Sequence, residues 1–258
     1  MASGRDDVIL YEYPFTERVR SLLRLEDLFD KLAFFIEQPH PYCHHAALMA
    51  LFEILEVTSR TDLKGDLLLE LERQRQALQG LRNNPQVAQE ALASVLSEIE
   101  QSQHSLNASP GKAGHHLRDN EWLTSIRSRA GIPGGTCEFD LPSYHAWLMG
   151  AADSRHRDLL TWVQPLQKFS AALGMVLRLL RESAHHSTQV AAQGSYQQAL
   201  QGRSYALLQV RVAGQAEAIP EISANRYMLW IRFTAPDGDL KPRAVDREVA
   251  FDLALCAL

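Results

Sequence analysis

The sequence has few of the residues that build disulfide-rich or membrane-spanning proteins. It contains 3 cysteines in 258 residues, at positions 43, 137 and 256, and this odd, dispersed set predicts no disulfide framework and fits a reducing compartment. The chain opens without a charged leader followed by an apolar core, and its longest helical apolar stretch, Ala171 to Leu180, is interrupted by Arg178. We therefore expect a cytoplasmic protein that makes no direct contact with a membrane.

An excess of positive charge is also missing. The formal net charge is −5, and the first 110 residues carry 10 Lys and Arg against 17 Asp and Glu. Nucleic-acid-binding proteins are more often basic, so this balance argues against a nucleic-acid partner. The 46% of hydrophobic and 22% of charged residues are ordinary for a packed protein of one large domain or two modest ones.

Motifs for metal binding are absent. Three His doublets stand at 44–45, 115–116 and 185–186, but neighbouring side chains on a helix point about 100° apart and rarely bind one ion. No Cys-x-x-Cys or His-Glu-x-x-His accompanies them. Solvated histidines at helix ends are the simpler interpretation, and we expect neither a metal nor a cofactor.

A catalytic site is not predicted either. Asp140, Ser143 and His145 are residue types of a hydrolytic triad, but they lie within six residues and no Gly-x-Ser-x-Gly turn presents the serine. Ser143 is better explained as the N-cap of a helix after Pro142. The glycines at 131–135 lack the lysine and hydroxyl of a phosphate-binding loop. An enzyme that uses His145 with a neighbouring carboxylate stays as an alternative.

Apolar residues at helical spacing fill most of the first 182 residues. Asp62 is a plausible N-cap, and Pro165 should start a new turn or kink the last helix. The third and fourth helices can pair as a hairpin, and their apolar faces can serve either the core or an interface. Helices are predicted over residues 17–37, 42–57, 62–81, 86–105, 120–129, 143–148 and 155–182.

The pattern becomes strand-like near the C-terminus. Residues 187–202 are expected to form a connector, and Pro236-Asp237-Gly238 supplies turn chemistry. The predicted fold class is α+β, a mainly helical body with a smaller antiparallel β-sheet portion. The expected domains are 15–185, mainly helical, and 203–258, β-stranded and joined by strand pieces 8–13 and 136–140 in one sheet. Further strands are predicted over residues 205–212, 226–234 and 245–255.

Arginine gives the clearest binding signal. Arg20 and Arg24 project from one stripe of the first helix, and the alternative is a solvated face with Glu17 and Asp27 as partners. In the strand at 226–234, a two-residue period puts one set of side chains outward and Tyr227, Leu229, Ile231 and Phe233 on the core face. The outward set is Arg226, Met228, Trp230 and Arg232.

That outward face suits a peptide whose carboxylates are spaced along an apolar ridge. Arginine binds carboxylate bidentately, and Trp230 offers a large apolar anchor. Two alternatives remain. Trp230 can be buried between layers with the arginines on the rim. The same face can also serve a nucleic-acid-binding regulator, with Trp230 as a stacking platform beside Arg226 and Arg232.

Two stretches carry a family likeness. Residues 131–148 read GIPGGTCEFDLPSYHAWL, and residues 8–26 read VILYEYPFTERVRSLLRLE. Together with the segments at 62–74, 175–184 and 251–256, in this order, they resemble the ZapD family, bacterial cell-division proteins that associate with the FtsZ ring. The likeness extends from about Val8 to Cys256, nearly the whole chain.

The resemblance implies a non-enzymatic, cytoplasmic homodimer at the midcell division ring. Such proteins bind the C-terminal tail of FtsZ, a short segment with acidic, apolar and proline residues, and cross-link its filaments. Family residues linked to bundling match Arg24, His145 and Arg232, and another basic family position matches Lys64. Two family arginines are replaced, by Glu121 and Met228. Arg118, Arg127 and Arg129 lie near the first replacement, and Arg226 can substitute for the second.

The sequence thus predicts electrostatic and apolar capture of the tail in a groove between the helical body and the sheet. Arg24, Arg226 and Arg232 are expected to face the carboxylates of the tail. The expected partner-binding residues are Arg20, Arg24, Lys64, His145, Arg226, Trp230 and Arg232.

Overall fold

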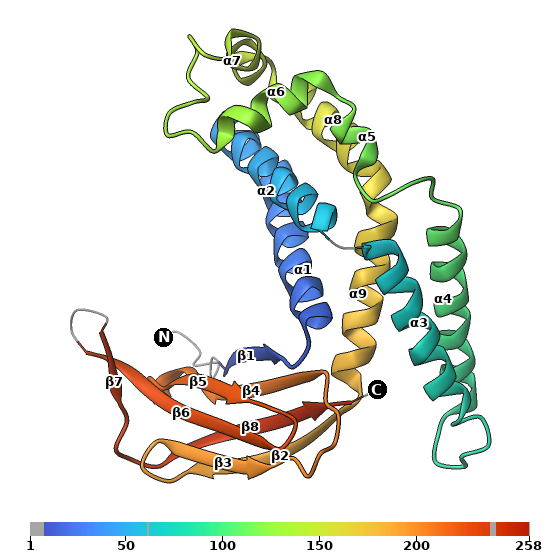
Figure 1. Ribbon diagram of the computed structural model, residues 1–258, viewed down its shortest axis with the longest axis vertical. Helices are drawn as coiled ribbons and strands as arrows, with labels where there is room; N and C mark the ends of the chain where they lie inside the picture. Colours follow the sequence, from blue (N-terminus) through green and yellow to red (C-terminus); the bar gives the residue numbers. More distant parts are fainter. Residues whose placement is uncertain (1–7, 61, 238–240, 258) are drawn as a thin grey trace, which may run out of the picture. The chain divides into compact units, whose positions relative to one another are not determined.

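The computed structural model describes residues 8–60, 62–237 and 241–257 and has the predicted α+β composition (Figure 1). The chain forms two compact units. The helical unit runs from Ser21 to Leu177, and the β unit combines the residues up to Arg20 with those from Arg178 onward. The division falls within the first and the last long helix.

Helical spacing predicted the long helices correctly. Asp62 caps α3, because its carboxylate accepts a hydrogen bond from the Gly65 amide at 3.3 Å. Pro165 lies in a 3₁₀ turn, Gln164–Leu166, that separates α8 from α9. The helices are α1 (Glu17–Ile36), α2 (Pro41–Arg60), α3 (Leu63–Gln79), α4 (Gln89–Asn107), α5 (His115–Arg118), α6 (Glu121–Ala130), α7 (Pro142–Met149), α8 (Ala152–Val163) and α9 (Gln167–Glu182).

The helical unit is built around α2, which contacts α6, α7 and α8. Its apolar face is fully covered, with Leu48, Leu51 and Ile54 at zero exposure. The expected pairing of α3 with α4 is confirmed, since the two helices contact each other along the hairpin. Within this unit, Gln74 of α3 also donates from Nε2 to the Val176 carbonyl of α9 at 2.9 Å.

A buried arginine joins the loops of the helical unit. Arg155 of α8 is 3% exposed, and its guanidinium donates to the carbonyls of Pro39, Leu148 and Gly150. Its Nε donates to Nδ1 of His44 at 3.0 Å, and Nε2 of His44 donates to the Ile36 carbonyl at 3.2 Å. These bonds fix the loop between α1 and α2 against the end of α7.

The strand expected at 136–140 is wrong. Residues 131–140 form successive turns, in which the Gly135 amide bonds the Ile132 carbonyl and the Cys137 amide bonds the Gly134 carbonyl. Because the backbone is satisfied locally, no ladder forms. Ser143 does not cap α7 either. Leu141 is the N-cap and Pro142 the first helical residue.

The β unit contains two antiparallel sheets rather than the single sheet that was expected. One sheet has the order β1-β4-β8-β2, which confirms that the first strand pairs with C-terminal strands. The other has the order β3-β6-β5, with β7 also paired to β6. The strands are β1 (Val8–Pro14), β2 (Ala184–Ala191), β3 (Ser195–Ala199), β4 (Leu207–Ala213), β5 (Ile219–Ala224), β6 (Met228–Asp237), β7 (Lys241–Ala244) and β8 (Val249–Cys256).

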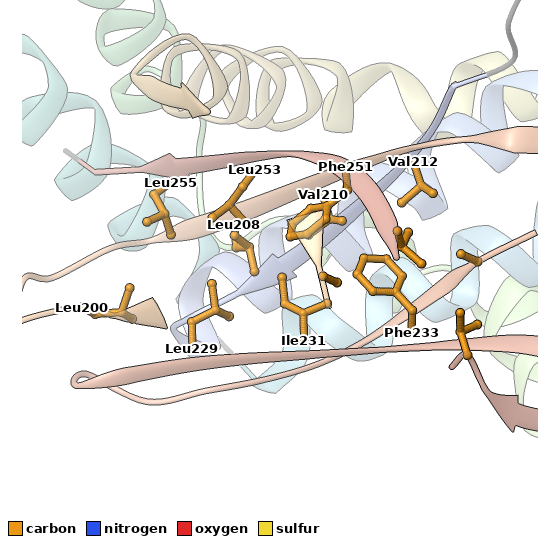
Figure 2. Packing of buried hydrophobic residues seen from close by; sticks show 14 residues of the cluster. Leu200, Leu208, Val210, Val212, Leu229, Ile231, Phe233, Phe251, Leu253 and Leu255 are labelled. Atoms are coloured by element: carbon orange, nitrogen blue, oxygen red, sulfur yellow. The ribbon is translucent and has the colours of Figure 1, made fainter. Parts of the chain in front are cut away.

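Apolar side chains from both sheets fill the space between them (Figure 2). Val210 and Phe251 point from one sheet toward Ile231 and Phe233 of the other, and all four are at most 2% exposed. The rings of Phe233 and Phe251 lie 5.2 Å apart. This core fixes which face of β6 is turned outward.

Residues 187–202 are not the expected connector, because they lie in β2, β3 and two tight turns. Gln193 and Gly194 both have positive φ, 49° and 68°, as a type I′ hairpin turn requires. Gln201 and Gly202 repeat this geometry, with φ of 52° and 73°, between β3 and β4. The expected turn at Pro236-Asp237-Gly238 lies partly outside the described residues, and its first two residues belong to β6.

An ion pair within the β unit ties β1 to the end of α9. Arg181 donates from Nε and Nη2 to the two carboxylate oxygens of Glu12, at 2.9 and 2.7 Å. Burial raises the pKa of Glu12, but the hydrogen bonds from Arg181 and Gln209 outweigh it and hold this pKa below its ordinary value. Glu12 is therefore ionised in the folded protein at neutral pH.

Candidate functional site

The outward face of β6 is the best candidate for a binding surface. Leu229, Ile231 and Phe233 are buried in the core, as the two-residue period predicted, whereas Tyr227, expected on the same face, lies before the strand and is 58% exposed. Trp230 between them is 37% exposed, and Arg232 is exposed as well. The alternative in which Trp230 is buried between layers is therefore wrong.

Trp230 and Arg232 line a hollow of about 320 Å³ on this sheet. The neighbouring strands β3 and β5 supply its sides. The ladder places Gln197 and Ser223 beside Trp230, and it places Ser195 and Glu221 beside Arg232. The hollow is lined by Ser195, Tyr196, Gln197, Glu221, Ile222, Ser223, Trp230, Ile231 and Arg232. It therefore combines two aromatic residues, one guanidinium, one carboxylate and several small polar groups.

Arg232 is available to a ligand. Its cross-strand neighbours are Ser195 on β3 and Glu221 on β5, and directly opposed side chains share one face of a sheet. Nevertheless, in the part of the chain that the structure describes, the Arg232 guanidinium makes no hydrogen bond or ion pair. Glu221 is the nearest carboxylate in the ladder and lowers the positive potential at this end of the hollow.

Arg226 does not share the periodic face of β6. The strand begins at Met228, and Asn225 caps the turn before it by accepting from the amides of Tyr227 and Met228 at 2.8 and 2.9 Å. The Arg226 guanidinium stacks over the Tyr227 ring, 4.8 Å from its centroid. The prediction that Arg226 and Arg232 bracket Trp230 along one strand is therefore wrong, because turn geometry replaces the strand at Arg226.

The two arginines of α1 differ in their partners. Arg20 forms an ion pair with Glu17 at 3.0 Å. The other expected carboxylate, Asp27, pairs with Lys31 at 2.6 Å. Arg24 is exposed and, over the described ranges, has no hydrogen bond or ion pair. Arg24 is thus the arginine of this stripe with a free guanidinium.

Lys64 has a structural role. Its ammonium donates to the carbonyls of Ser109 at 2.8 Å and Asn107 at 3.4 Å, where α4 ends. A cation at a helix C-terminus satisfies carbonyls without helical partners and stabilises the helix dipole. Lys64 therefore holds the start of α3 against the end of α4.

His145 lies on α7 beside an aromatic cluster. Its Nε2 is 3.6 Å from a carboxylate oxygen of Glu138, and the pair is partly exposed. The neighbouring rings of the cluster have centroids 5.6 to 6.1 Å apart. They belong to Trp122, Tyr144, Trp147 and Trp162. Burial raises the pKa of Tyr144, whose hydroxyl lies 2.6 Å from Nδ1 of His45.

The arginines near Glu121 are already engaged. Arg118 donates to the Leu55 carbonyl at 3.1 Å and to the Thr58 hydroxyl at 3.3 Å, both on α2. Arg127 donates to Glu56 at 2.8 Å, and Arg129 lies 3.7 Å from Asp140. These three side chains stabilise the helical unit in the structure as it stands.

The residues of a hydrolytic triad do not assemble. The Ser143 hydroxyl accepts from the Trp122 indole at 3.2 Å, and Asp140 faces Arg129. Among residues 8–60, 62–237 and 241–257, no group of three or more His, Cys, Asp or Glu side chains is placed to hold a metal ion. Within the same ranges, every helix is too short or too polar to cross a membrane.

The expected site residues divide between the two units. Arg20, Arg226, Trp230 and Arg232 belong to the β unit, whereas Arg24, Lys64 and His145 belong to the helical unit. Within the β unit, the hollow brings together only Trp230 and Arg232 of the expected set.

Sequence reasoning missed the polar side of the hollow. Ser195, Gln197 and Glu221 come from β3 and β5, and these strands were not predicted because their composition is polar. The Gln193-Gly194 dipeptide is the signal that could have found β3, because Xaa-Gly between two short runs is typical of a type I′ hairpin.

Comparison with known proteins identifies the family. Residues 23–232 match the ZapD family, described as cell division protein. The chain is similar to the cell division protein ZapD of Cupriavidus pinatubonensis, with 60% identity over 250 residues that cover 96% of this chain and 99% of the relative. It is 59% identical to the cell division protein ZapD of Cupriavidus metallidurans, with the same coverage.

Proposed function

Because this chain belongs to the ZapD family of non-enzymatic cell division proteins, we propose that it binds the C-terminal tail of FtsZ and cross-links FtsZ filaments. In this proposal, a cytoplasmic homodimer carries one tail site in each subunit and promotes assembly of the Z-ring at midcell. A bivalent cross-linker needs only modest affinity at each site, because the second contact forms at a high effective concentration.

The observation that carries the proposal is the pairing of an exposed Trp230 with an unpartnered Arg232 in one hollow. Arginine binds carboxylate through two parallel hydrogen bonds, and an exposed tryptophan provides apolar area at low entropic cost. An acidic and apolar tail fits this combination, because a carboxylate can pair with Arg232 while an apolar side chain covers Trp230.

The geometry of β6 defines the preferred ligand. Residues two apart on a strand are separated by about 6.8 Å and point to the same side. An extended peptide lying along β6 can therefore place a carboxylate over Arg232 and an apolar side chain, two residues away, over Trp230. The outward Gln197 and Ser223 beside Trp230 offer hydrogen bonds to the peptide backbone.

The expected cations on α1, α3 and α7 form a second set in this proposal. Arg24 is free to bind an acidic group, and His145 needs only to leave the long contact with Glu138. Arg20 and Lys64 would first have to give up the bonds described above. We therefore rank Arg24 and His145 above Arg20 and Lys64 as partner-binding residues.

The experiment that tests the function is co-sedimentation of purified FtsZ filaments with this protein. Full-length FtsZ is compared with FtsZ that lacks its C-terminal tail, at low and at physiological salt. The expected result is bundling that depends on the tail and weakens with salt, because exposed charge pairs are screened over about 8 Å at physiological ionic strength. Failure to pellet with either form of FtsZ would refute the proposed partner.

The site is tested by reversing the charge of Arg232. The variant Arg232→Glu is expected to abolish bundling while its melting temperature stays that of the wild type. Arg203→Glu is the matched control, since Arg203 is an exposed arginine of the same unit that does not line the hollow. Normal bundling by Arg232→Glu would show that the tail binds elsewhere.

A further inference from the structure

Another hollow, of about 350 Å³, lies in the helical unit between the loop after α4 and the start of α9. The loop contributes residues from Ser109 to His116, and the other side contributes Gln164 to Phe169. Phe169 is 3% exposed, and together with Pro110 and Pro165 it gives the hollow an apolar surface. This volume is within the range of sites for small molecules.

The lining of this hollow is cationic. Four of its side chains carry basic nitrogens, and none of the residues that line it is acidic. In the described part of the chain, the ammonium groups of the two lysines make no hydrogen bond or ion pair. The four side chains are Lys112, His115, His116 and Lys168.

The backbone beneath these basic side chains is fixed. Gly114 has φ of 73°, and a Cβ at this position would collide with Leu55, so only glycine allows this close approach. His116 donates from Nε2 to the Trp162 carbonyl at 2.9 Å. The Ser109 carbonyl is held by Lys64 at 2.8 Å. A loop fixed from both ends presents its cations without a large ordering cost when a ligand binds.

We propose that this hollow binds a small, multivalent anion of the phosphate class. Its charges are the two lysine ammonium groups, which lie beside two imidazoles, and the lining contains no arginine. Lysine binds phosphate as a compact point charge, whereas planar carboxylate recognition favours the fork of arginine. The phosphate oxygens are expected between Lys112 and Lys168, with His115 and His116 at the sides. The site is separate from the hollow on β6 and does not depend on the proposed function.

Inorganic pyrophosphate is the probe for this site. The full-length protein is titrated by isothermal titration calorimetry at low salt, and its melting temperature is followed in parallel. The wild type is expected to bind pyrophosphate and to melt about 3 °C higher at roughly ten times the dissociation constant. Citrate, a multivalent carboxylate, is the comparison ligand and is expected to bind more weakly.

The test variant is Lys112→Gln/Lys168→Gln, which is expected to bind pyrophosphate about tenfold more weakly or worse. Its matched control is Lys31→Gln/Lys241→Gln, which removes the same charge from residues outside the hollow. Both lysines of the hollow are exposed, so the unliganded test variant should melt like the wild type. No binding by the wild type, equal weakening in both double variants, or tighter binding of citrate would each overturn the proposal.

Discussion

Arg155 donates from Nε to Nδ1 of His44 across 3.0 Å, deep inside the helical unit. The bond requires a neutral imidazole, because Nε2 of His44 donates to the Ile36 carbonyl and Nδ1 must accept. Among the residues that the structure describes, Arg155 contacts no carboxylate, and its other acceptors are backbone carbonyls. The interior of this unit is therefore held by one buried cation and its neutral acceptors.

Replacing Arg155 with alanine is expected to destabilise the protein strongly. The variant leaves three carbonyls and an imidazole nitrogen without their donor, at about 1 to 3 kcal/mol for each group that water cannot reach. We expect a loss of about 3 kcal/mol or more in the free energy of unfolding, measured with urea. Arg157→Ala, two residues further along α8 and exposed, should change it by less than about 0.5 kcal/mol.

Stability should fall as the pH falls below about 6.5, the ordinary pKa of an unfolded histidine. Burial lowers the pKa of His44. The hydrogen bond to the Ile36 carbonyl opposes this shift, whereas the electrostatic effects of Arg155 and His156 add to it. Burial also lowers the pKa of His45. The unfolded chain therefore takes up protons first, so the contribution of both histidines is fully present above about pH 6.5 and is lost below it.

Melting temperatures measured between about pH 8 and pH 5.5 test this dependence. The wild type should lose stability steadily toward the acid end, and His44→Gln/His45→Gln should show a flatter profile. His104→Gln removes an exposed histidine and should keep the wild-type slope. Parallel profiles for wild type and double variant would show that other groups control the response.

Gly194→Ala should destabilise the β unit more than Gly202→Ala. Both glycines have nearly the same positive φ, 68° and 73°, so alanine meets a similar backbone penalty of about 1 kcal/mol at each. A Cβ at Gly194 would also collide with the Val245 carbonyl, whereas nothing lies within 4 Å of a Cβ at Gly202. The difference between the urea midpoints of the two variants is expected to correspond to about 2 kcal/mol and measures the cost of the collision. Equal midpoints would show that the hairpin backbone shifts to accommodate the added methyl group.

Glu221→Gln is expected to tighten binding of an acidic FtsZ tail peptide about two- to fivefold at low salt. The substitution removes the carboxylate opposite Arg232 and leaves the shape of the hollow unchanged. Fluorescence anisotropy with a labelled tail peptide measures the change, which should shrink at physiological salt. Glu248→Gln removes an exposed carboxylate that does not line the hollow and should leave the affinity unaltered. Weaker binding by Glu221→Gln would place Glu221 among the groups that bind the peptide.

Long periodic segments were predictable from the sequence, and short polar ones were not. The helices α1 to α4, α6, α8 and α9 have an apolar stripe that must be buried, and this stripe is visible in the sequence. β2 and β3 are rich in Gln, Ser and His, because one side of each faces outward. Residues 136–140 are of types that favour strands, but the backbone groups of this segment form hydrogen bonds within local turns instead.

The candidate site divides in the same way. Trp230 and Arg232 were found because a strand alternates faces, a rule that needs no knowledge of the partner strands. Glu221 was missed because its place opposite Arg232 depends on the register of β5, which a single sequence does not display. Arg226 was misplaced by extending the alternation two residues beyond the start of β6.

The four tryptophans are distributed so that each unit carries its own optical signal. Trp122, Trp147 and Trp162 pack against one another in the helical unit, and the Trp147 indole donates to Asp158 at 2.9 Å. Trp230 stands alone on β6 with its indole partly in water. A peptide that covers the hollow would shift the emission of Trp230 to shorter wavelength, while the three clustered tryptophans would serve as an internal reference. Occupancy of the β unit can thus be followed without any attached dye.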